Sequence, residues 1–161
     1  MVEGLVCGYG TPNVTEARIT VEVDAPPEAV WAVISDPRHL PRWDRHITAV
    51  EGVPEGGLSV GLRYSTEIRF MGVAGIVDAE VLEWDPPRSS KIRLRGFIEA
   101  VVFTRVEPLP RGRSRIVHEV RYGFRGGPVG ALAASALRIT GGPQIVLRRG
   151  TLAQKRQIEA G

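Results

Sequence analysis

The chain has 161 residues, 43% of them hydrophobic and 24% charged, which is the composition of a globular protein long enough to bury its own core. Its net charge is +3, but the basic residues are scattered and no nucleic-acid recognition motif accompanies them, which argues against nucleic-acid binding. No apolar run approaches the roughly 18 residues of a membrane span, and the N-terminus lacks the basic and apolar segments of a signal peptide, so we expect a cytoplasmic protein without a membrane span.

Residues 1–14 form a Gly-rich N-terminal stretch that we expect to be flexible, ahead of a single domain over residues 15–161. Cys7, the only cysteine, lies in this stretch, and one cysteine can form neither an internal disulfide nor a cysteine-built zinc site. The sequence also lacks the common metalloprotease, nucleophile-elbow and phosphate-loop motifs. We therefore predict no metal and no cofactor.

The first regular elements are a strand and a short helix. Residues 18–23 alternate between apolar and polar side chains, as in a half-buried strand. Pro26, Pro27 and Glu28 then suit the first turn of a helix, where a proline needs no N–H partner and a carboxylate interacts well with the helix dipole. Pro37 ends this helix, and residues 38–43 can add at most another turn or two.

From residue 46 onward the apolar pattern has a period of two, which is typical of strands with one buried face. In residues 62–70, for example, Tyr64, Thr66 and Ile68 alternate with polar and charged neighbours. Short turns separate these segments, which predicts an antiparallel meander. The predicted strands are residues 46–53, 62–70, 73–84, 91–97, 98–108 and 115–124.

A long helical segment is predicted over residues 128–158, interrupted at residues 141–143, Gly-Gly-Pro. A proline inside a helix removes a backbone hydrogen bond and costs about 3 kcal/mol, so we predict a break or kink near residues 140–143 with a helix on each side. The break is either the hinge of a ligand portal or a bend that fits the helix to a curved sheet. The apolar stripe of the first half contains Val129, Leu132, Ala133, Ala136 and Ile139.

Together these elements predict an α+β fold. About seven antiparallel strands form a curved sheet around the long, kinked C-terminal helix, with one or two short helices after the first strand. A sheet that is apolar on one face must be covered, and the final helix is the only element large enough to do so. Since one helix cannot fill the whole concave face, we expect a cavity between helix and sheet.

The segment VEVDAPPEAVWAVISDPRHLPRWDRHITAVE, with the later VEPLPRGRSRIVHEV and the C-terminal amphipathic helix, resembles the START-like (SRPBCC) superfamily. Its similarity is to the polyketide cyclase/dehydrase-like branch and to START-like proteins of enediyne antibiotic clusters. The resemblance implies a helix-grip fold with an apolar cavity. It does not by itself decide between carriers, cyclases and resistance proteins, because one fold hosts many functions.

We interpret the chain as a protein that binds an apolar, aromatic or polyketide-derived small molecule in natural-product biosynthesis or self-resistance. One alternative is a polyketide cyclase or aromatase, and another is a regulatory module that contacts a protein partner through its Arg-rich outer surface. We favour binding because a cyclase needs several polar cavity groups and the sequence offers few, but enzymatic activity stays open.

The candidate ligand-binding residues lie on the inward faces of two predicted strands and of the helix. Apolar walls carrying a few hydrogen-bonding groups are typical of ligand pockets. His118 is the best acid–base candidate, since burial easily moves a histidine pKa, although it could equally be a satisfied core residue without a charged partner. The proposed set is Tyr64, Thr66, Ile68, His118, Val120, Tyr122, Leu132 and Ala136.

A dense polar cluster follows the first helix and raises the question of a second site. Its histidines are seven residues apart around two prolines, which is no known metal spacing. We interpret the cluster as a structural junction between helix and sheet, with Trp31 and Trp43 in structural roles. Its members are Asp36, Arg38, His39, Trp43, Asp44, Arg45 and His46.

Overall fold

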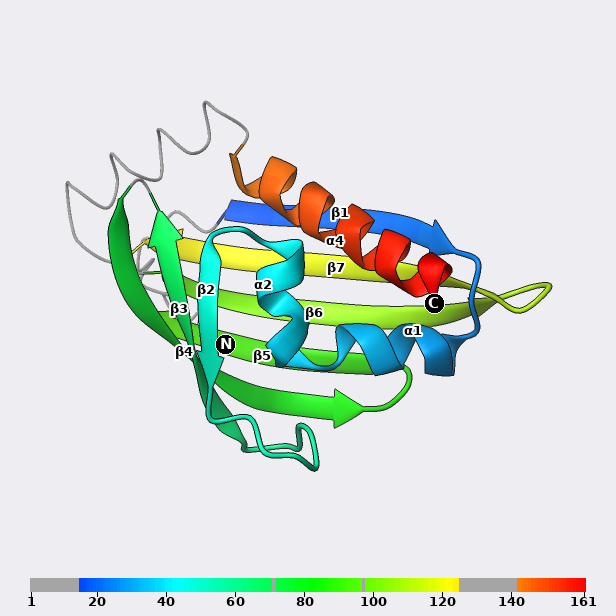
Figure 1. Cartoon of the computed structure of the whole chain (residues 1–161), viewed down its shortest axis with the longest axis horizontal. Helices are drawn as coiled ribbons and strands as arrows, with labels where there is room; N and C mark the ends of the chain where they lie inside the picture. Colours follow the sequence, from blue (N-terminus) through cyan, green and yellow to red (C-terminus); the bar gives the residue numbers. More distant parts are fainter. Residues whose placement is uncertain (1–14, 71, 97, 125–141) are drawn as a thin grey trace, which may run out of the picture.

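The computed structural model describes residues 15–70, 72–96, 98–124 and 142–161. Seven strands form one antiparallel sheet in the order β1-β7-β6-β5-β4-β3-β2 (Figure 1). The strands are β1 (Thr15–Val23), β2 (Ile47–Glu51), β3 (Arg63–Phe70), β4 (Val73–Asp85), β5 (Ser89–Gly96), β6 (Ile98–Leu109) and β7 (Arg113–Phe124). The predicted meander is confirmed from β2 to β7. The first strand, β1, pairs with the last strand, β7, and forms one edge of the sheet.

The helices are α1 (Pro27–Ile34), the 3-10 turn η1 (Pro37–His39), α2 (Leu40–Trp43) and α4 (Gly142–Ala160). Pro27 and Glu28 lie in the first turn of α1, as the sequence predicts. The helix ends before Pro37, and η1 and α2 supply the short turns expected over residues 38–43. The predicted α+β helix-grip fold is therefore confirmed.

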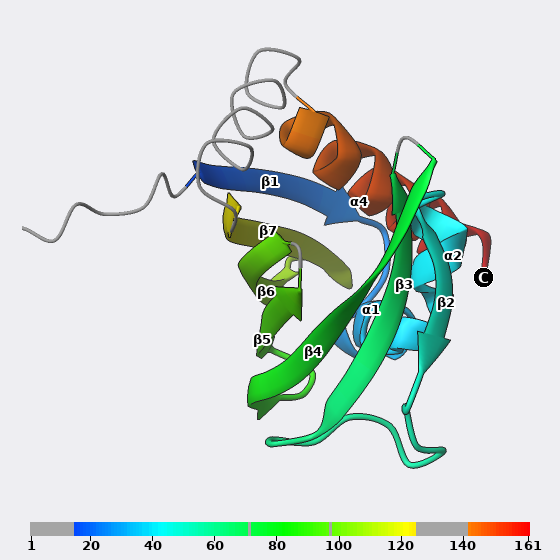
Figure 2. The ribbon, with the colours of Figure 1, turned by 90° about the vertical axis from the view of Figure 1, so that its left-hand side faces the viewer.

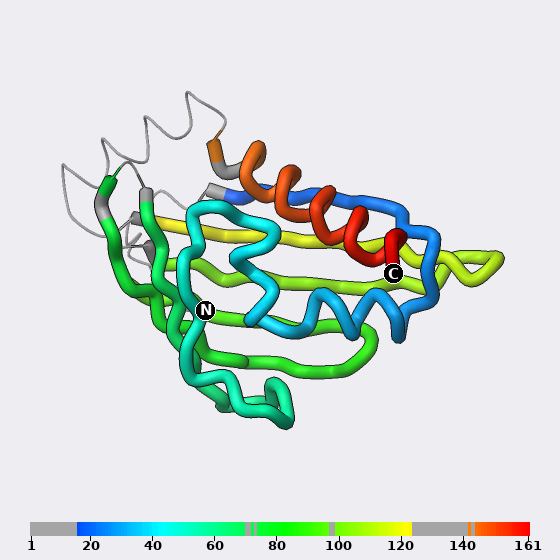
Figure 3. Tube along the Cα trace, viewed as in Figure 1, coloured from blue at the N-terminus to red at the C-terminus, as the bar shows by residue number. Residues whose placement is uncertain are grey.

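The sheet curves, and α1, α2 and α4 lie on its concave side (Figure 2). Among the described elements, α4 contacts β1, α1 and α2, and it runs along β1 (Figure 3). Side chains of α4 bond to the outer backbone edge of β1: Gln144 Nε2 donates to the carbonyl of Arg18, and Lys155 Nζ donates to that of Glu22, both at 2.7 Å. In this way α4 protects the exposed edge of β1 from pairing with another strand.

Residues 125–141 lie outside the described residues, and so do Leu132, Ala136 and the first half of the predicted helix. Within the described part, Pro143 lies in the first turn of α4, where a proline is tolerated. The predicted break near residues 140–143 stays a prediction.

The core is densest where α1 and the end of α4 cover β1, β6 and β7. Trp31 packs there with Ile116 and Ile158, and its ring lies 5.2 Å from that of Trp84. Two further apolar clusters lie along the concave face, one around Tyr64 and one around Tyr122. These two clusters contain residues of the predicted ligand site.

Candidate functional site

The predicted site residues of the two strands share the concave face but lie far apart on it. Tyr64 and Thr66 are buried on β3, and His118 and Tyr122 are buried on β7. The strands β4, β5 and β6 separate the two groups, which at about 4.8 Å per strand spacing places them roughly 19 Å apart along the sheet. The two groups therefore lie on the same face of the sheet, but they do not lie on neighbouring strands.

The face between these two groups is lined by small and apolar side chains. The register places Ala79, Leu94 and Ala100 in one row between Tyr64 and Tyr122. The next row contains Ile92, Val102 and Val120. In these two rows, the side chains of Ile92, Leu94, Val102 and Val120 are only half-buried.

His118 is fully engaged by neutral partners. Its Nε2 lies 2.9 Å from Gln154 Oε1 on α4, and its Nδ1 lies 2.9 Å from Thr104 Oγ1 on β6. Burial lowers the pKa of His118, and the hydrogen bond to Gln154 opposes this shift without outweighing it. The ring is therefore a neutral polar link between the sheet and α4.

The two inward hydroxyls on β3 differ in their bonding. Thr66 Oγ1 donates to the carbonyl of Val77 at 3.2 Å, so its one O–H donor is used within the sheet. The hydroxyl of Tyr64 has no hydrogen-bond partner in the described part of the chain. Burial raises the pKa of Tyr64 well above its ordinary value, so this hydroxyl stays protonated. Ile68, two residues further along β3, is half-buried.

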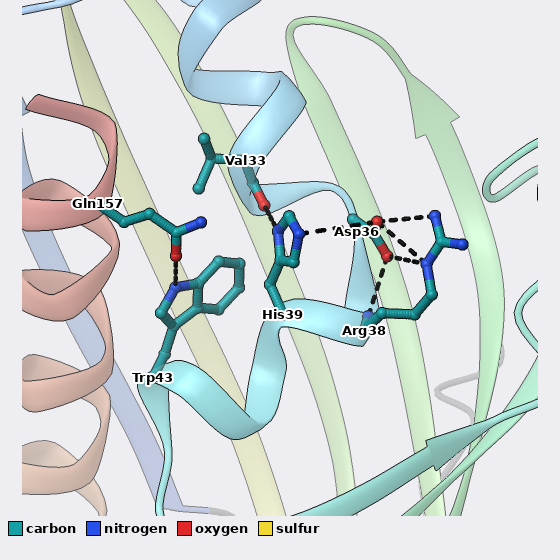
Figure 4. Close-up of polar contacts among 6 residues, drawn as sticks. All are labelled: Val33, Asp36, Arg38, His39, Trp43 and Gln157. Atoms are coloured by element: carbon teal, nitrogen blue, oxygen red, sulfur yellow. Dashed lines mark hydrogen bonds and ion pairs between the residues drawn. The ribbon is translucent and has the colours of Figure 1, made fainter. Parts of the chain in front are cut away.

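The polar cluster after α1 forms contacts that hold local backbone and join elements (Figure 4). Asp36 accepts from the backbone N–H of Arg38 at 3.0 Å and also pairs with the Arg38 guanidinium, which lowers the pKa of Asp36. His39 Nδ1 donates to the carbonyl of Val33 at 3.1 Å. Trp43 Nε1 donates to Gln157 Oε1 on α4 at 2.8 Å.

The rest of that cluster also serves the backbone. The backbone N–H of His46 donates to Asp44 Oδ1, and the ring Nδ1 of His46 lies 3.2 Å from the carbonyl of Arg69 on the neighbouring strand. These contacts agree with the interpretation of a structural junction. Among the described residues, no group of three or more His, Cys, Asp or Glu side chains could hold a metal ion, and no described helix is long and apolar enough to cross a membrane.

The sequence profile of the family "Polyketide cyclase / dehydrase and lipid transport" matches residues 14–145. The chain belongs to this family. The match confirms the START-like polyketide cyclase branch and supports ligand binding or cyclase activity in general. A search of curated proteins found no match to the chain.

Solved structures with the same fold span nearly the whole chain. The protein TTHA0849 from Thermus thermophilus is 17% identical, with a TM-score of 0.71 over 91% of this chain and 98% of that chain. The Zhui aromatase/cyclase from Streptomyces sp. R1128 is 17% identical, with a TM-score of 0.68 over 91% and 92%. A START superfamily protein from Mycobacterium smegmatis is 17% identical, with a TM-score of 0.63 over 89% and 98%. At these identities the likeness shows the fold alone.

Two open hollows mark the outer surface of this START-like protein. One of about 550 Å³ lies between β1 and α4, and one of about 460 Å³ lies over β3, β4 and β5. Charged residues that alternate with the buried Tyr64 and Ala79 line the second hollow, which places it on the convex face. There Glu80 pairs with Arg63 at 3.3 Å and with Arg93 at 3.4 Å, so its carboxylate offsets part of their positive charge. We regard both hollows as surface relief rather than as the predicted cavity.

Three residues that were not predicted from the sequence hydrogen-bond to His118 and Trp43: Thr104, Gln154 and Gln157. Thr104 could have been found, because a hairpin centred on Arg111 places residues seven positions to either side opposite each other. The two glutamines had no such signal. Their partners are distant in sequence, and only the docking of α4 brings them together.

Proposed function

We propose that this family member binds an apolar, aromatic or polyketide-derived small molecule on its concave face, between the sheet and α4. The observation that carries the proposal is the patch formed by Ile92, Leu94, Val102 and Val120, which stays partly exposed although helices cover this side of the sheet. Apolar side chains of a well-filled core would be buried. Contact with an apolar ligand would remove this surface from water, at about 25 cal/mol per Å².

The surroundings of this patch also favour a ligand with a large apolar body. The neighbouring positions Ala79 and Ala100 carry small side chains, which take up little of the space above the sheet. We propose that this ligand belongs to natural-product biosynthesis or self-resistance; the family match and the fold likeness to an aromatase/cyclase support the first of these settings.

The cyclase alternative draws less support from the site. Both ring nitrogens of His118 bind neutral protein groups, so the ring could act as a base only after giving up the bond from Thr104. A charged partner that would raise its basicity is not among these contacts. Binding requires none of these changes.

A tryptophan substitution on the concave face tests the proposal. Val120→Trp places a large ring in the patch and should abolish binding of the uncharged fluorescent probe N-phenyl-1-naphthylamine. The matched control is Val101→Trp, because Val101 is also half-buried on the sheet but alternates to the convex face beside Arg93 and Arg121. Circular dichroism should stay nearly unchanged in both variants. Undiminished probe binding by a folded Val120→Trp protein would contradict the proposed site.

A further inference from the structure

Tyr64 belongs to a buried apolar cluster, and its hydroxyl has no hydrogen-bond partner among the described residues. It is only 6% exposed and packs with Leu58, Ala79 and Val81, and the half-buried Leu94 contacts the same cluster. Burying a phenol in such surroundings without a hydrogen bond is unfavourable, so a native protein normally gives the hydroxyl a partner.

Two other polar side chains that face this side are already hydrogen-bonded. Thr66 bonds to the carbonyl of Val77, and His118 bonds to Thr104 and Gln154. In the described part of the chain, every side-chain nitrogen or oxygen that is sealed from solvent has a hydrogen-bond partner. Since the Tyr64 hydroxyl has none there, it must border space that solvent or a ligand can reach.

Ser90 is the other inward hydroxyl without a partner in the described residues. It lies between Trp84 and Thr104 in the register. Trp84 packs against Trp31, so Ser90 belongs to the part of the concave face that α1 covers. Trp84 also packs against the cluster that contains Tyr64, but that cluster extends to Ile92 and Leu94 of the proposed ligand patch.

We propose that Tyr64 determines ligand specificity at the proposed site: its hydroxyl donates a hydrogen bond to a carbonyl oxygen of an otherwise apolar aromatic ligand. This inference rests on the proposed function and names the chemical class that the site selects. A pure hydrocarbon would cover the hydroxyl and leave it unbonded, whereas a ketone of the same shape replaces the bond that solvent supplies.

The chemistry of the phenol suits a donor. Burial raises its pKa, so the hydroxyl keeps its proton throughout the neutral range and cannot serve as a negatively charged group. The ligand oxygen must therefore be an acceptor. Because the one O–H donor of Thr66 is already engaged, Tyr64 is the inward hydroxyl of β3 that can donate to such a ligand.

A matched pair of probes tests this. 9-Fluorenone and fluorene have nearly the same shape and differ in the carbonyl group. Tyr64→Phe removes only the hydroxyl and should weaken fluorenone binding about tenfold, with fluorene binding unchanged or improved. The infrared carbonyl band of bound fluorenone should move to higher wavenumber in Tyr64→Phe, because the hydrogen bond is lost. Thr66→Val is the control and should leave the ratio of the two affinities unchanged, since Thr66 is bonded to Val77.

The outcomes separate this inference from the proposed function. Equal effects of Tyr64→Phe on both probes, or an unmoved carbonyl band, would overturn the role of Tyr64 while binding on the concave face stands. Failure of both probes to bind the wild-type protein would overturn the proposed function and this inference with it. Tyr64→Phe should leave the free energy of unfolding nearly unchanged, because the hydroxyl that it removes has no partner among the described residues.

Discussion

The contacts of His118 determine its tautomer. Gln154 Oε1 can only accept, so Nε2 carries the proton and donates it. The Nδ1 atom is then the acceptor, and the Thr104 hydroxyl donates to it. Neutral partners on both sides and burial make the uncharged ring the stable form in the folded protein.

This arrangement predicts a loss of stability in mild acid. The folded-state pKa of His118 is lowered, whereas in the unfolded chain it is about 6.5. Below that value the unfolded state takes up the proton first, so the free energy of unfolding falls as the pH drops from about 6.5 toward the folded-state pKa. Each pH unit costs up to about 1.4 kcal/mol from this one group.

Urea denaturation between about pH 7.5 and pH 5 measures the effect. His118→Gln removes the titrating ring and should flatten this part of the stability profile, even if the variant is less stable at every pH. Asp36 and Glu159 also have lowered pKa values, but carboxylates of this kind lose their contribution at lower pH and remain in both proteins. Parallel profiles for the two proteins would show that His118 is not the group responsible.

At the scale of elements, α4 joins the sheet to α2 on the concave side through side-chain hydrogen bonds. Gln154 and Gln157 are three residues apart, so they lie on adjoining parts of one helix face. Gln154 reaches the sheet through His118, and Gln157 reaches α2 through Trp43. The junction between α2 and α4 therefore depends on one ring that is both buried and hydrogen-bonded.

Two substitutions of Trp43 separate these contributions. Trp43→Ala should lower the free energy of unfolding by about 3–5 kcal/mol, since the ring is only 8% exposed. Trp43→Phe keeps most of the apolar area but loses the bond to Gln157, and it should cost about 1–3 kcal/mol. Urea denaturation measures both. A loss of ligand binding by Trp43→Phe with no loss of stability would instead place this junction in the functional site.

The strands could be predicted because their information is local. Tyr64, Thr66 and Ile68 alternate with polar neighbours, and short turns leave adjacent strands little choice but to pair. Each of the seven predicted strands agrees with an observed strand to within three residues at either end. The same alternation assigned Tyr64, Thr66, His118 and Tyr122 to the buried face.

The bonding of those residues could not be predicted in the same way. His118 and Gln154 are 36 residues apart, and Trp43 and Gln157 are 114 apart, so their pairing depends on how α4 docks. Alternation also cannot tell a satisfied hydroxyl from an unsatisfied one. Thr66 and Tyr64 have the same place in the pattern, but only Thr66 is bonded within the described residues.

At the scale of the whole molecule, several arginines of the convex face share glutamates as ion-pair partners. Glu22 pairs with Arg113 at 3.4 Å and with Arg115 at 3.1 Å, and Glu80 bridges Arg63 and Arg93. Such exposed pairs add little stability. Their effect is on the electrostatic field, because each glutamate between two arginines weakens the attraction for an outside anion.

Heparin chromatography tests whether the convex face is available to an acidic partner. We expect the wild-type protein to pass through a heparin column at about 0.15 M NaCl, where screening is strong beyond about 8 Å. Glu22→Gln combined with Glu80→Gln removes the ion pairs of Arg63, Arg93 and Arg113 and should cause retention, while Arg115 keeps its pair with Glu107 at 3.6 Å. The control, Glu28→Gln with Glu55→Gln, adds the same net charge at two glutamates that form no ion pair in the described residues, and it should elute earlier than the first double variant. Strong retention of the wild-type protein would mean that the arginines are free to act, and would favour the regulatory alternative with a protein partner.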